Sequence, residues 1–325
     1  MSDGVSMLGW MVTVVTLLGL LAFDLLAVSR RRSAVTPGGA ARWIGLYVGL
    51  ALVAAVVMLV WLGRETAEQF VATYVTEYSL SADNLFVFML IIGRFAVPDH
   101  AVEEVLSIGI LLSLALRTIF IAAGSAAVHA FNWIFYLFGA FLVYTAVRLL
   151  LSARSGDSGE EEKPPGVALL SRLIPATDVY DGRRFTTTIE ARRVLTPIPL
   201  VVAAIGVANL VFALDSLPAA FGLTQSTFVI ITANAFAMLG LRQLYYVVGG
   251  LLERIVYLPI ALAVVLGFIG VKLVLEALRG SHVFHVGPVD VPEIGVGPSL
   301  GIILGVLAIA VVASTLRTRG TDPAG

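Results

Sequence analysis

The chain of 325 residues contains no cysteine and few charged residues, which make up 13% of it. The absence of cysteine excludes disulfide bonds, metal sites built on thiolates and cysteine nucleophiles. The four histidines (His100, His129, His282 and His285) fall at or beyond the ends of long apolar runs, which excludes imidazole ligands in the middle of those runs. The chain also lacks a phosphate-binding loop and a basic patch interleaved with aromatics. Nucleotide hydrolysis and a nucleic-acid partner are therefore not expected.

Apolar residues form 58% of the chain, and the mean hydropathy is +0.95. A soluble protein of this length has no core large enough to hide so much apolar surface, so lipid must be the solvent. Nine apolar runs are long enough to span about 30 Å of hydrocarbon, which predicts an all-α polytopic membrane protein. The predicted spans are 6–28, 43–63, 72–93, 104–128, 131–151, 197–223, 226–250, 255–279 and 298–316.

Basic residues predict how the chain lies in the cell membrane. Arginines cluster at 30–42 after the first span, in the connection 152–196, and at 317–319 after the last span. With nine spans, all three clusters fall on one side of the membrane. By the positive-inside rule, the amino end is predicted outside and the carboxyl end in the cytoplasm. The first span lacks the basic segment and cleavage site of a signal peptide, so it is predicted to be retained.

Two sets of three predicted spans resemble each other. Leu114-Ala-Leu-Arg117 in the fourth span matches Leu239-Gly-Leu-Arg242 in the seventh, and Asn84-Leu-Phe matches Asn209-Leu-Val at almost the same offset. An odd number of helices in each copy forces opposite orientations in the bilayer. The chain is therefore predicted to contain two inverted three-helix repeats, an arrangement typical of transporters. Chance similarity between leucine-rich segments is the alternative.

The repeat divides the chain into six predicted segments. They are two N-terminal spans at 1–71, the first repeat at 72–151, a cytoplasmic linker at 152–196, the second repeat at 197–279, an outer loop at 280–297, and the last span with a cytoplasmic tail at 298–325. The linker begins with a polar, proline-containing stretch that is typical of solvated chain. Its latter part, from Phe185, is predicted to pair as short strands.

Two acidic pairs lie inside predicted spans, Asp83-Asn84 in the third and Asp215-Ser216 in the sixth. An ionised aspartate in hydrocarbon costs roughly 2.5–3.5 kcal/mol even on a lenient scale. Such pairs at corresponding places in two repeats indicate a site that needs negative charge, as a cation site does. Short polar side chains at 79–84 and a proline at Pro218 predict that both helices are interrupted there. An ordinary proline kink is the alternative in the sixth span.

Charge inside the spans is out of balance by one carboxylate. Glu77, Asp83 and Asp215 occur with two arginines, Arg117 and Arg242, which are predicted to act as counter-charges. The competing interpretation is that the two arginines only form structural ion pairs with two of the carboxylates. The third carboxylate would then still need a divalent cation or a proton to balance its charge. Oxygen ligands suit hard ions such as manganese, magnesium or calcium. The predicted metal ligands are Glu77, Asp83, Asn84, Asn209, Asp215 and Ser216, with Ser81 and Asn234 in supporting positions.

Six sequence motifs surround these residues. They are EYSLSADNLFVF at 77–88, FAVP at 95–98, YLFGAF at 136–141, FALDSLP at 212–218, ANAFAMLGLRQLY at 233–245 and GFIGVK at 267–272. Together they resemble the TerC/Alx family of integral membrane proteins over most of residues 10–316. The resemblance implies manganese homeostasis by efflux from bacterial cells, an association with tellurium resistance and links to metal loading of exported proteins. It also implies that Glu77, Asp83, Asn84 and Asp215 carry the site.

The second repeat departs from the pattern that the resemblance implies. Asn209 stands where the family usually has an aspartate, and Gly206 stands where its members often have a glutamate. An asparagine can still offer an oxygen, but a negative charge is missing. This departure is expected to weaken divalent binding, to alter coupling, or to mark a different substrate.

The combined prediction is a membrane transporter that exports a divalent cation, manganese in the first place, through a carboxylate site at the middle of the bilayer. It is predicted to work by alternating access with proton coupling, and Mn²⁺ is its substrate. Neither enzyme activity nor a prosthetic cofactor is predicted. The alternative is a membrane scaffold of the tellurium-resistance type, which assists metal loading or secretion of partner proteins and moves no ions. An intramembrane aspartyl protease is a more distant alternative.

Overall fold

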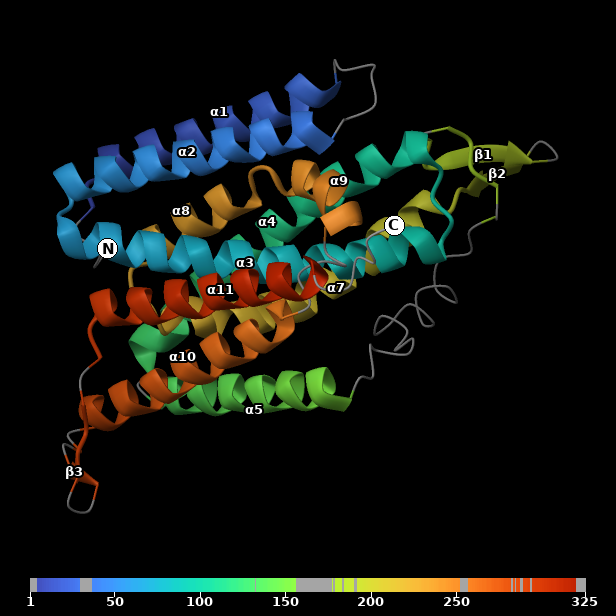
Figure 1. Ribbon diagram of the computed structural model, residues 1–325. Helices are drawn as coiled ribbons and strands as arrows, with labels where there is room; N and C mark the ends of the chain where they lie inside the picture. The colour runs from blue at the N-terminus through green and yellow to red at the C-terminus, as the bar shows by residue number, and fades with distance from the viewer. Residues whose placement is uncertain are drawn as a thin grey trace.

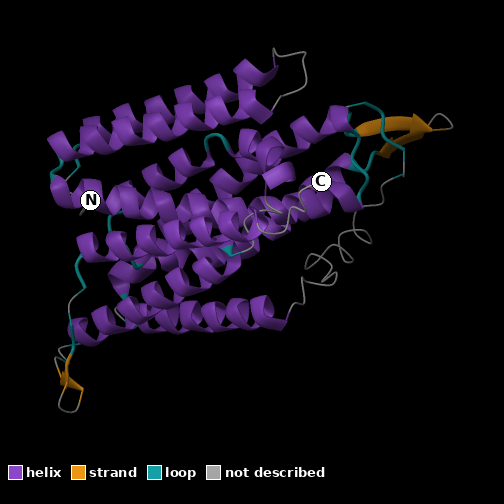
Figure 2. Cartoon of the chain, viewed as in Figure 1, coloured by secondary structure: helices purple, strands orange, loops and turns teal. Residues whose placement is uncertain are grey.

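The computed structural model is a bundle of long helices with two short β-hairpins (Figures 1 and 2). It describes residues 5–29, 37–131, 133–155, 177, 179–182, 184–189, 192–251, 257–281, 283, 285–286, 289–292 and 294–319. The helices are α1 (Met7–Ser29), α2 (Pro37–Trp61), α3 (Arg64–Arg94), α4 (Asp99–Ala130), α5 (Ile134–Ser155), α7 (Ile198–Phe221), α8 (Thr227–Met238), α9 (Leu241–Leu251), α10 (Leu258–Gly280) and α11 (Val296–Arg319). The strands are β1 (Thr186–Ile189), β2 (Arg192–Leu195), β3 (His285–Val286) and β4 (Val289–Asp290).

Within the described residues, seven helices are long and apolar enough to cross a membrane, or eight if the bent pair α8 and α9 forms one span. This confirms the predicted all-α polytopic membrane protein. The count of nine spans stays a prediction, because α3 has 31 residues but carries charged side chains along its length. It also begins eight residues before the predicted span, with Arg64 and Glu65 in its first turn.

Prolines begin several of the helices. Pro37 is the first residue of α2, Pro98 directly precedes α4, and Pro259 lies in the first turn of α10. The fixed φ of proline suits a first turn, where the amide hydrogen that it lacks would have no partner in the helix. The start of α8 is capped instead, because the side chain of Ser226 accepts a hydrogen bond of 3.3 Å from the amide of Val229.

The predicted interruptions at the two acidic pairs do not occur. α3 is continuous through residues 79–84, and the hydroxyl of Ser79 donates to the carbonyl oxygen of Val75 at 2.7 Å, which keeps this polar group within the helix. α7 is continuous through Pro218, which lies in its last turn, where the helix ends anyway. The prediction of broken helices at these positions is therefore wrong.

The break lies instead between α8 and α9, inside the seventh predicted span. The two helices are bent by 41° across Leu239 and Gly240. Gly240 has a φ of +84°, which a side chain would strain. A Cβ atom there would also lie 2.8 Å from Cδ2 of Tyr47. Glycine at 240 therefore permits both the turn and the close approach of α2.

The centre of the bundle is formed by α3 and α8. Ten of the twelve residues of α8 are buried, and α3 contributes buried side chains to each of the three apolar clusters. α1 and α2 lie along one edge of the bundle, and α5 and α10 lie along the opposite edge (Figure 1). Only 6% of the apolar window of α1 is buried, so this helix presents most of its surface to lipid.

The pairing of the helices can be compared with the predicted repeat, which stays a prediction. Among the described residues, α5 and α10 form the most extensive contact, and the pairs α3–α8 and α4–α7 follow with equal extent. Under the predicted repeat, α3 corresponds to α7 and α4 corresponds to α8. Exchange of the two repeats would therefore convert the pair α3–α8 into the pair α7–α4. α5 and α10 can approach closely because Gly139 has no side chain. A Cβ at this position would lie 2.9 Å from the carbonyl oxygen of Gly270. The opposite orientation of the repeats in a membrane stays a prediction.

The two hairpins project from opposite ends of the bundle (Figure 2). β1 and β2 pair antiparallel, with Thr186 opposite Leu195, which confirms the strands predicted in the linker. The earlier part of the linker, 156–176, lies outside the described residues. In the other hairpin, Nε2 of His285 lies 2.7 Å from Oδ1 of Asp290, and both side chains are exposed. His282 lies outside the described residues.

Candidate functional site

A buried ion pair lies where α8 packs against α3 and α4. Nη1 of Arg117 on α4 donates hydrogen bonds to the carboxylate of Glu77 on α3 and to Oδ1 of Asn234 on α8, the second at 2.9 Å. Glu77 is 3% exposed, Arg117 is 2% exposed and Asn234 is fully buried. We call these three residues the ionic centre. Because each comes from a different helix, the fold alone brings them together.

Polar atoms without partners lie on α3 and α8, the helices that carry Glu77 and Asn234. Within the described part of the chain, the hydroxyls of Thr73, Thr76 and Ser81 on α3, the hydroxyl of Thr232 on α8, and the side-chain nitrogen of Asn234 are buried and make no hydrogen bond. A buried polar group left without a partner costs about 1–3 kcal/mol. Native proteins contain few such groups, and each one requires an explanation, such as a ligand or water. The nitrogen of Asn234, and the hydroxyls of Thr73 and Ser81 one helical turn to either side of Glu77, therefore indicate a place where something else binds.

A small cavity adjoins this region on the side of α7. Ser81, Ser113 and Asn209 supply its polar lining, and Leu85 and Met238 lie among its apolar neighbours. Its size suits about one water molecule. The side-chain nitrogen of Asn209 donates to the carbonyl oxygen of Gly109 at 3.1 Å, so this residue also ties α7 to α4.

The other predicted site residues fall into two groups. Ser216 on α7 is 4% exposed and therefore buried. Asp83, Asn84 and Asp215 lie in continuous helix, but their side chains lie outside the described part of the structure. Among the side chains that are described, no three histidine, cysteine or acidic groups converge in a way that could hold a metal ion. The roles predicted for the two aspartates stay predictions.

The missing acidic group at position 206 has a packing reason. A Cβ on Gly206 would lie 2.9 Å from Cδ2 of Leu112, and a Cβ on Gly109 would lie 2.9 Å from Cγ2 of Ile205. α7 and α4 therefore approach closely here, and a longer side chain at 206 would meet the end of the Leu112 side chain. A glutamate at 206 would require Leu112 to move.

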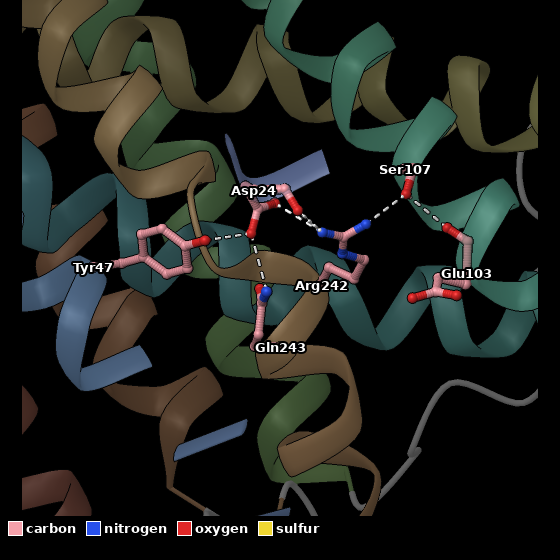
Figure 3. A network of polar contacts seen from close by, with 6 residues as sticks. All are labelled: Asp24, Tyr47, Glu103, Ser107, Arg242 and Gln243. Carbon is pink, nitrogen blue, oxygen red and sulfur yellow. Dashed lines mark hydrogen bonds and ion pairs between the residues drawn. The ribbon is translucent and has the colours of Figure 1, made fainter. Parts of the chain in front are cut away.

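Arg242 pairs with a carboxylate that the sequence did not assign to it. Its Nη2 lies 3.2 Å from Oδ2 of Asp24 on α1 and donates to the carbonyl oxygen of the same residue at 2.5 Å, while Nη1 donates to the hydroxyl of Ser107 on α4 at 3.1 Å. The side chains of Tyr47 and Gln243 both donate to Oδ1 of Asp24, that of Gln243 at 3.0 Å (Figure 3). We call these five residues the Asp24 network.

The Asp24 network corrects the prediction that both arginines serve central carboxylates. Asp24 is 7% exposed and Arg242 is 3% exposed, so their charges compensate each other away from water. The network joins α1, α2, α4 and α9 directly after the bend at Gly240. The sequence carried one signal, an aspartate inside an otherwise apolar first span, but nothing in it named the partner.

These features define a class of protein, a multi-pass α-helical membrane protein with charged groups buried inside its bundle. The chain belongs to the integral membrane protein TerC family, which matches residues 62–322. α1 and α2 precede the matched region. This result confirms the resemblance seen in the sequence motifs.

Relatives match the chain over nearly its whole length. An uncharacterized membrane protein of Mycobacterium tuberculosis is 40% identical over 322 residues, which are 98% of this chain and 81% of that protein. An uncharacterized membrane protein of Myxococcus xanthus is 35% identical over 310 residues, 95% of this chain and 92% of that protein. A protein of Escherichia coli named "Putative membrane-bound redox modulator Alx" is 35% identical over 302 residues, 90% of this chain and 89% of that protein. No solved structure matches the chain.

Proposed function

We propose that this protein exports a divalent metal cation, with manganese as the first candidate, through the ionic centre. One observation carries the proposal: the carboxylate of Glu77 and the amide of Asn234 meet at a buried arginine, and the hydroxyls of Thr73 and Ser81, one helical turn to either side of Glu77, lack partners in the described structure. Polar and charged groups inside a membrane protein typically mark the pathway of an ion or substrate.

The chemistry of the centre suits a hard cation. Carboxylate, amide and hydroxyl oxygens are the ligands that manganese, magnesium and calcium prefer. In the structure, Arg117 neutralises Glu77. A divalent cation would compete with the guanidinium for the carboxylate and would take the free oxygen of Ser81, one helical turn along α3, as a further ligand. Asp83 and Asp215 would complete this set from their positions on α3 and α7.

Alternating access would follow from the repeat. Within the pairs α3–α8 and α4–α7, the helices contact each other to the same extent, and the two pairs would be equivalent under the proposed repeat. Rocking of one pair against the other would open the site first to one side of the membrane and then to the other. Exchange of the cation for a proton on a carboxylate would couple export to the proton gradient. With the orientation that the positive-inside rule predicts, the first turn of α3 would face the outside.

The name of the relative in Escherichia coli points to redox modulation by that protein. This chain contains no cysteine, so it has no thiol that could exchange with a disulfide. The scaffold alternative, in which the protein supports metal loading or secretion of partners, is tested by purified protein in liposomes. Manganese flux into the liposomes supports the transporter. Absence of flux, together with binding to translocation partners, supports the scaffold.

Alanine substitution of Asp83 or Asp215 is expected to abolish manganese tolerance in cells that lack other manganese exporters. The reason is that each substitution removes one of the two predicted principal ligands. Cellular manganese and growth in manganese-rich medium are the measurements, at matched protein levels. Asp181→Ala is the control, because this carboxylate lies outside the spans and pairs with Arg184 at the surface. Wild-type tolerance in both aspartate variants would contradict the proposed mechanism.

A further inference from the structure

A cavity of about 910 Å³ lies at the end of the bundle where α3 begins and α10 ends. The first turns of α3, the connection between α7 and α8, the last turns of α10 and the start of α11 form its walls. Its lining includes the carboxylates of Glu65, Glu68 and Glu276 and the hydroxyl of Thr224, together with cationic side chains of α10. We call this cavity the vestibule.

Gln69 on α3 lies at the boundary between the vestibule and the protein interior. Its side-chain nitrogen donates to Oε1 of Glu65 at 3.3 Å, and its oxygen accepts a hydrogen bond of 2.6 Å from the hydroxyl of Thr224. Both partners line the vestibule. The contact between Gln69 and Thr224 therefore connects α3 to the loop before α8 at the inner wall of the vestibule.

From Gln69, polar residues continue inward along α3 at every fourth position. Thr73, Glu77 and Ser81 follow at this spacing, which places them on one face of the helix, about 6 Å apart. We call Gln69, Thr73, Glu77 and Ser81 the α3 stripe. It leads from the wall of the vestibule through the ionic centre to the small cavity beside Asn209.

The hydroxyls of the α3 stripe are buried and free. Thr73 is fully buried, Ser81 is 1% exposed, and neither hydroxyl has a partner in the described part of the chain. In a bilayer, an apolar side chain would be the expected occupant of such positions. A row of free oxygens one helical turn apart can replace the hydration shell of a cation step by step. Such ligands also bind weakly enough to let the cation leave.

We infer that the α3 stripe is the path between the ionic centre and the vestibule, and that Thr73 is the ligand that a divalent cation meets between them. This inference rests on the proposed function and adds the route and the release chamber to it. The vestibule takes a hydrated divalent cation, because it offers carboxylate and hydroxyl oxygens in a space of about 910 Å³, which is large enough for the ion and its water shell.

The absence of cysteine makes the inference directly testable. Single cysteines are introduced as Thr73→Cys and Ala72→Cys, two neighbouring and fully buried positions of α3, of which only the first belongs to the stripe. A membrane-impermeant cationic methanethiosulfonate reagent is applied to sealed vesicles from each side in turn, with and without Mn²⁺. The wild-type protein has no thiol and gives the background. Manganese flux of the wild-type protein is measured in the same vesicles.

The cysteine at 73 is expected to react about tenfold faster than the cysteine at 72, from the side of the vestibule, because thiol modification follows access. Mn²⁺ is expected to slow this reaction. Flux by the wild-type protein together with equal reactivity at both positions, or with no protection by Mn²⁺, would overturn the inference and leave the proposed function intact. Absence of flux would overturn both.

A second pair of variants covers the case in which Thr73→Cys does not reach the membrane. Thr73→Val keeps the shape of the side chain but removes the hydroxyl, whereas Thr73→Ser keeps the hydroxyl. Valine is expected to slow manganese flux about tenfold, which corresponds to 1.4 kcal/mol, because it removes the hydroxyl ligand. Serine keeps the hydroxyl and is expected to leave the flux near the wild-type rate. Thr118→Val is the control, because that hydroxyl already bonds to the carbonyl oxygen of Leu114. Equal flux in the valine and serine variants would contradict the role of Thr73.

Discussion

Glu77→Gln is expected to abolish manganese export and to lower the stability of the folded protein at the same time. The substitution leaves the guanidinium of Arg117, which is 2% exposed, without its counter-charge. Breaking a buried ion pair by removing one partner costs about 3–5 kcal/mol. Manganese flux in liposomes and the melting temperature in detergent measure the two effects.

A double variant separates the two effects of Glu77→Gln. Glu77→Gln combined with Arg117→Gln removes both charges of this pair, so most of the lost stability is expected to return, while flux stays absent because the carboxylate ligand is gone. Asp181→Asn is the matched control, because Asp181 pairs with Arg184 at the surface, 3.7 Å away, where an ion pair contributes little. Wild-type flux in the double variant would show that Glu77 is only a structural partner of Arg117.

Asp24→Asn is expected to destabilise the protein by about 3–5 kcal/mol, because Arg242 is 3% exposed and loses its counter-charge. Two further donors, the hydroxyl of Tyr47 and the amide of Gln243, lose a charged acceptor as well. The melting temperature in detergent measures this effect. Since α1 is otherwise in slight contact with the bundle, limited proteolysis is expected to release it from the variant.

Two controls define what the Asp24 network contributes. Tyr47→Phe removes one hydrogen bond but leaves the ion pair, so it is expected to lower stability by about 1–2 kcal/mol. Asp24→Asn combined with Arg242→Gln removes both charges and is expected to recover much of the loss. Stability of Asp24→Asn equal to that of the wild type would mean that the network does not hold α1 and α2 to the bundle.

The fold class could be predicted from the sequence because lipid imposes a simple rule. A segment that crosses hydrocarbon must be apolar and must satisfy its own backbone hydrogen bonds, so helices follow from apolar runs. The strands from Phe185 onward could be predicted for a similar reason, since Thr186–Ile189 is rich in residues that favour strands. These are local properties, and local properties can be read from a sequence.

The errors arose where local signals competed with packing. Ser79 was expected to weaken α3, but inside the bundle its hydroxyl bonds back to Val75 and the helix continues. The bend at Gly240 depends on α2, whose Tyr47 lies against the glycine, and this contact has no local signature. The partner of Arg242 is likewise Asp24, which lies 218 positions away in the chain.

The candidate site shows the same division. Glu77, Arg117 and Asn234 were all named from the sequence, because polar groups stand out in apolar spans. Their assembly into one centre, with Arg117 bonded to both of the others, came from the packing of three helices. Thr73, Thr76 and Thr232 were not named, because threonine is common in membrane helices and only burial without a partner distinguishes these three.

The most direct test of the central claim is an anomalous difference map from crystals of the wild-type protein soaked in Mn²⁺. The account predicts a peak between α3 and α8, within ligand distance of the carboxylate of Glu77, and loss of that peak in Glu77→Gln. A manganese peak only at the protein surface would contradict the account. So would the absence of any peak inside the bundle while the ion pair between Arg117 and Glu77 remains intact.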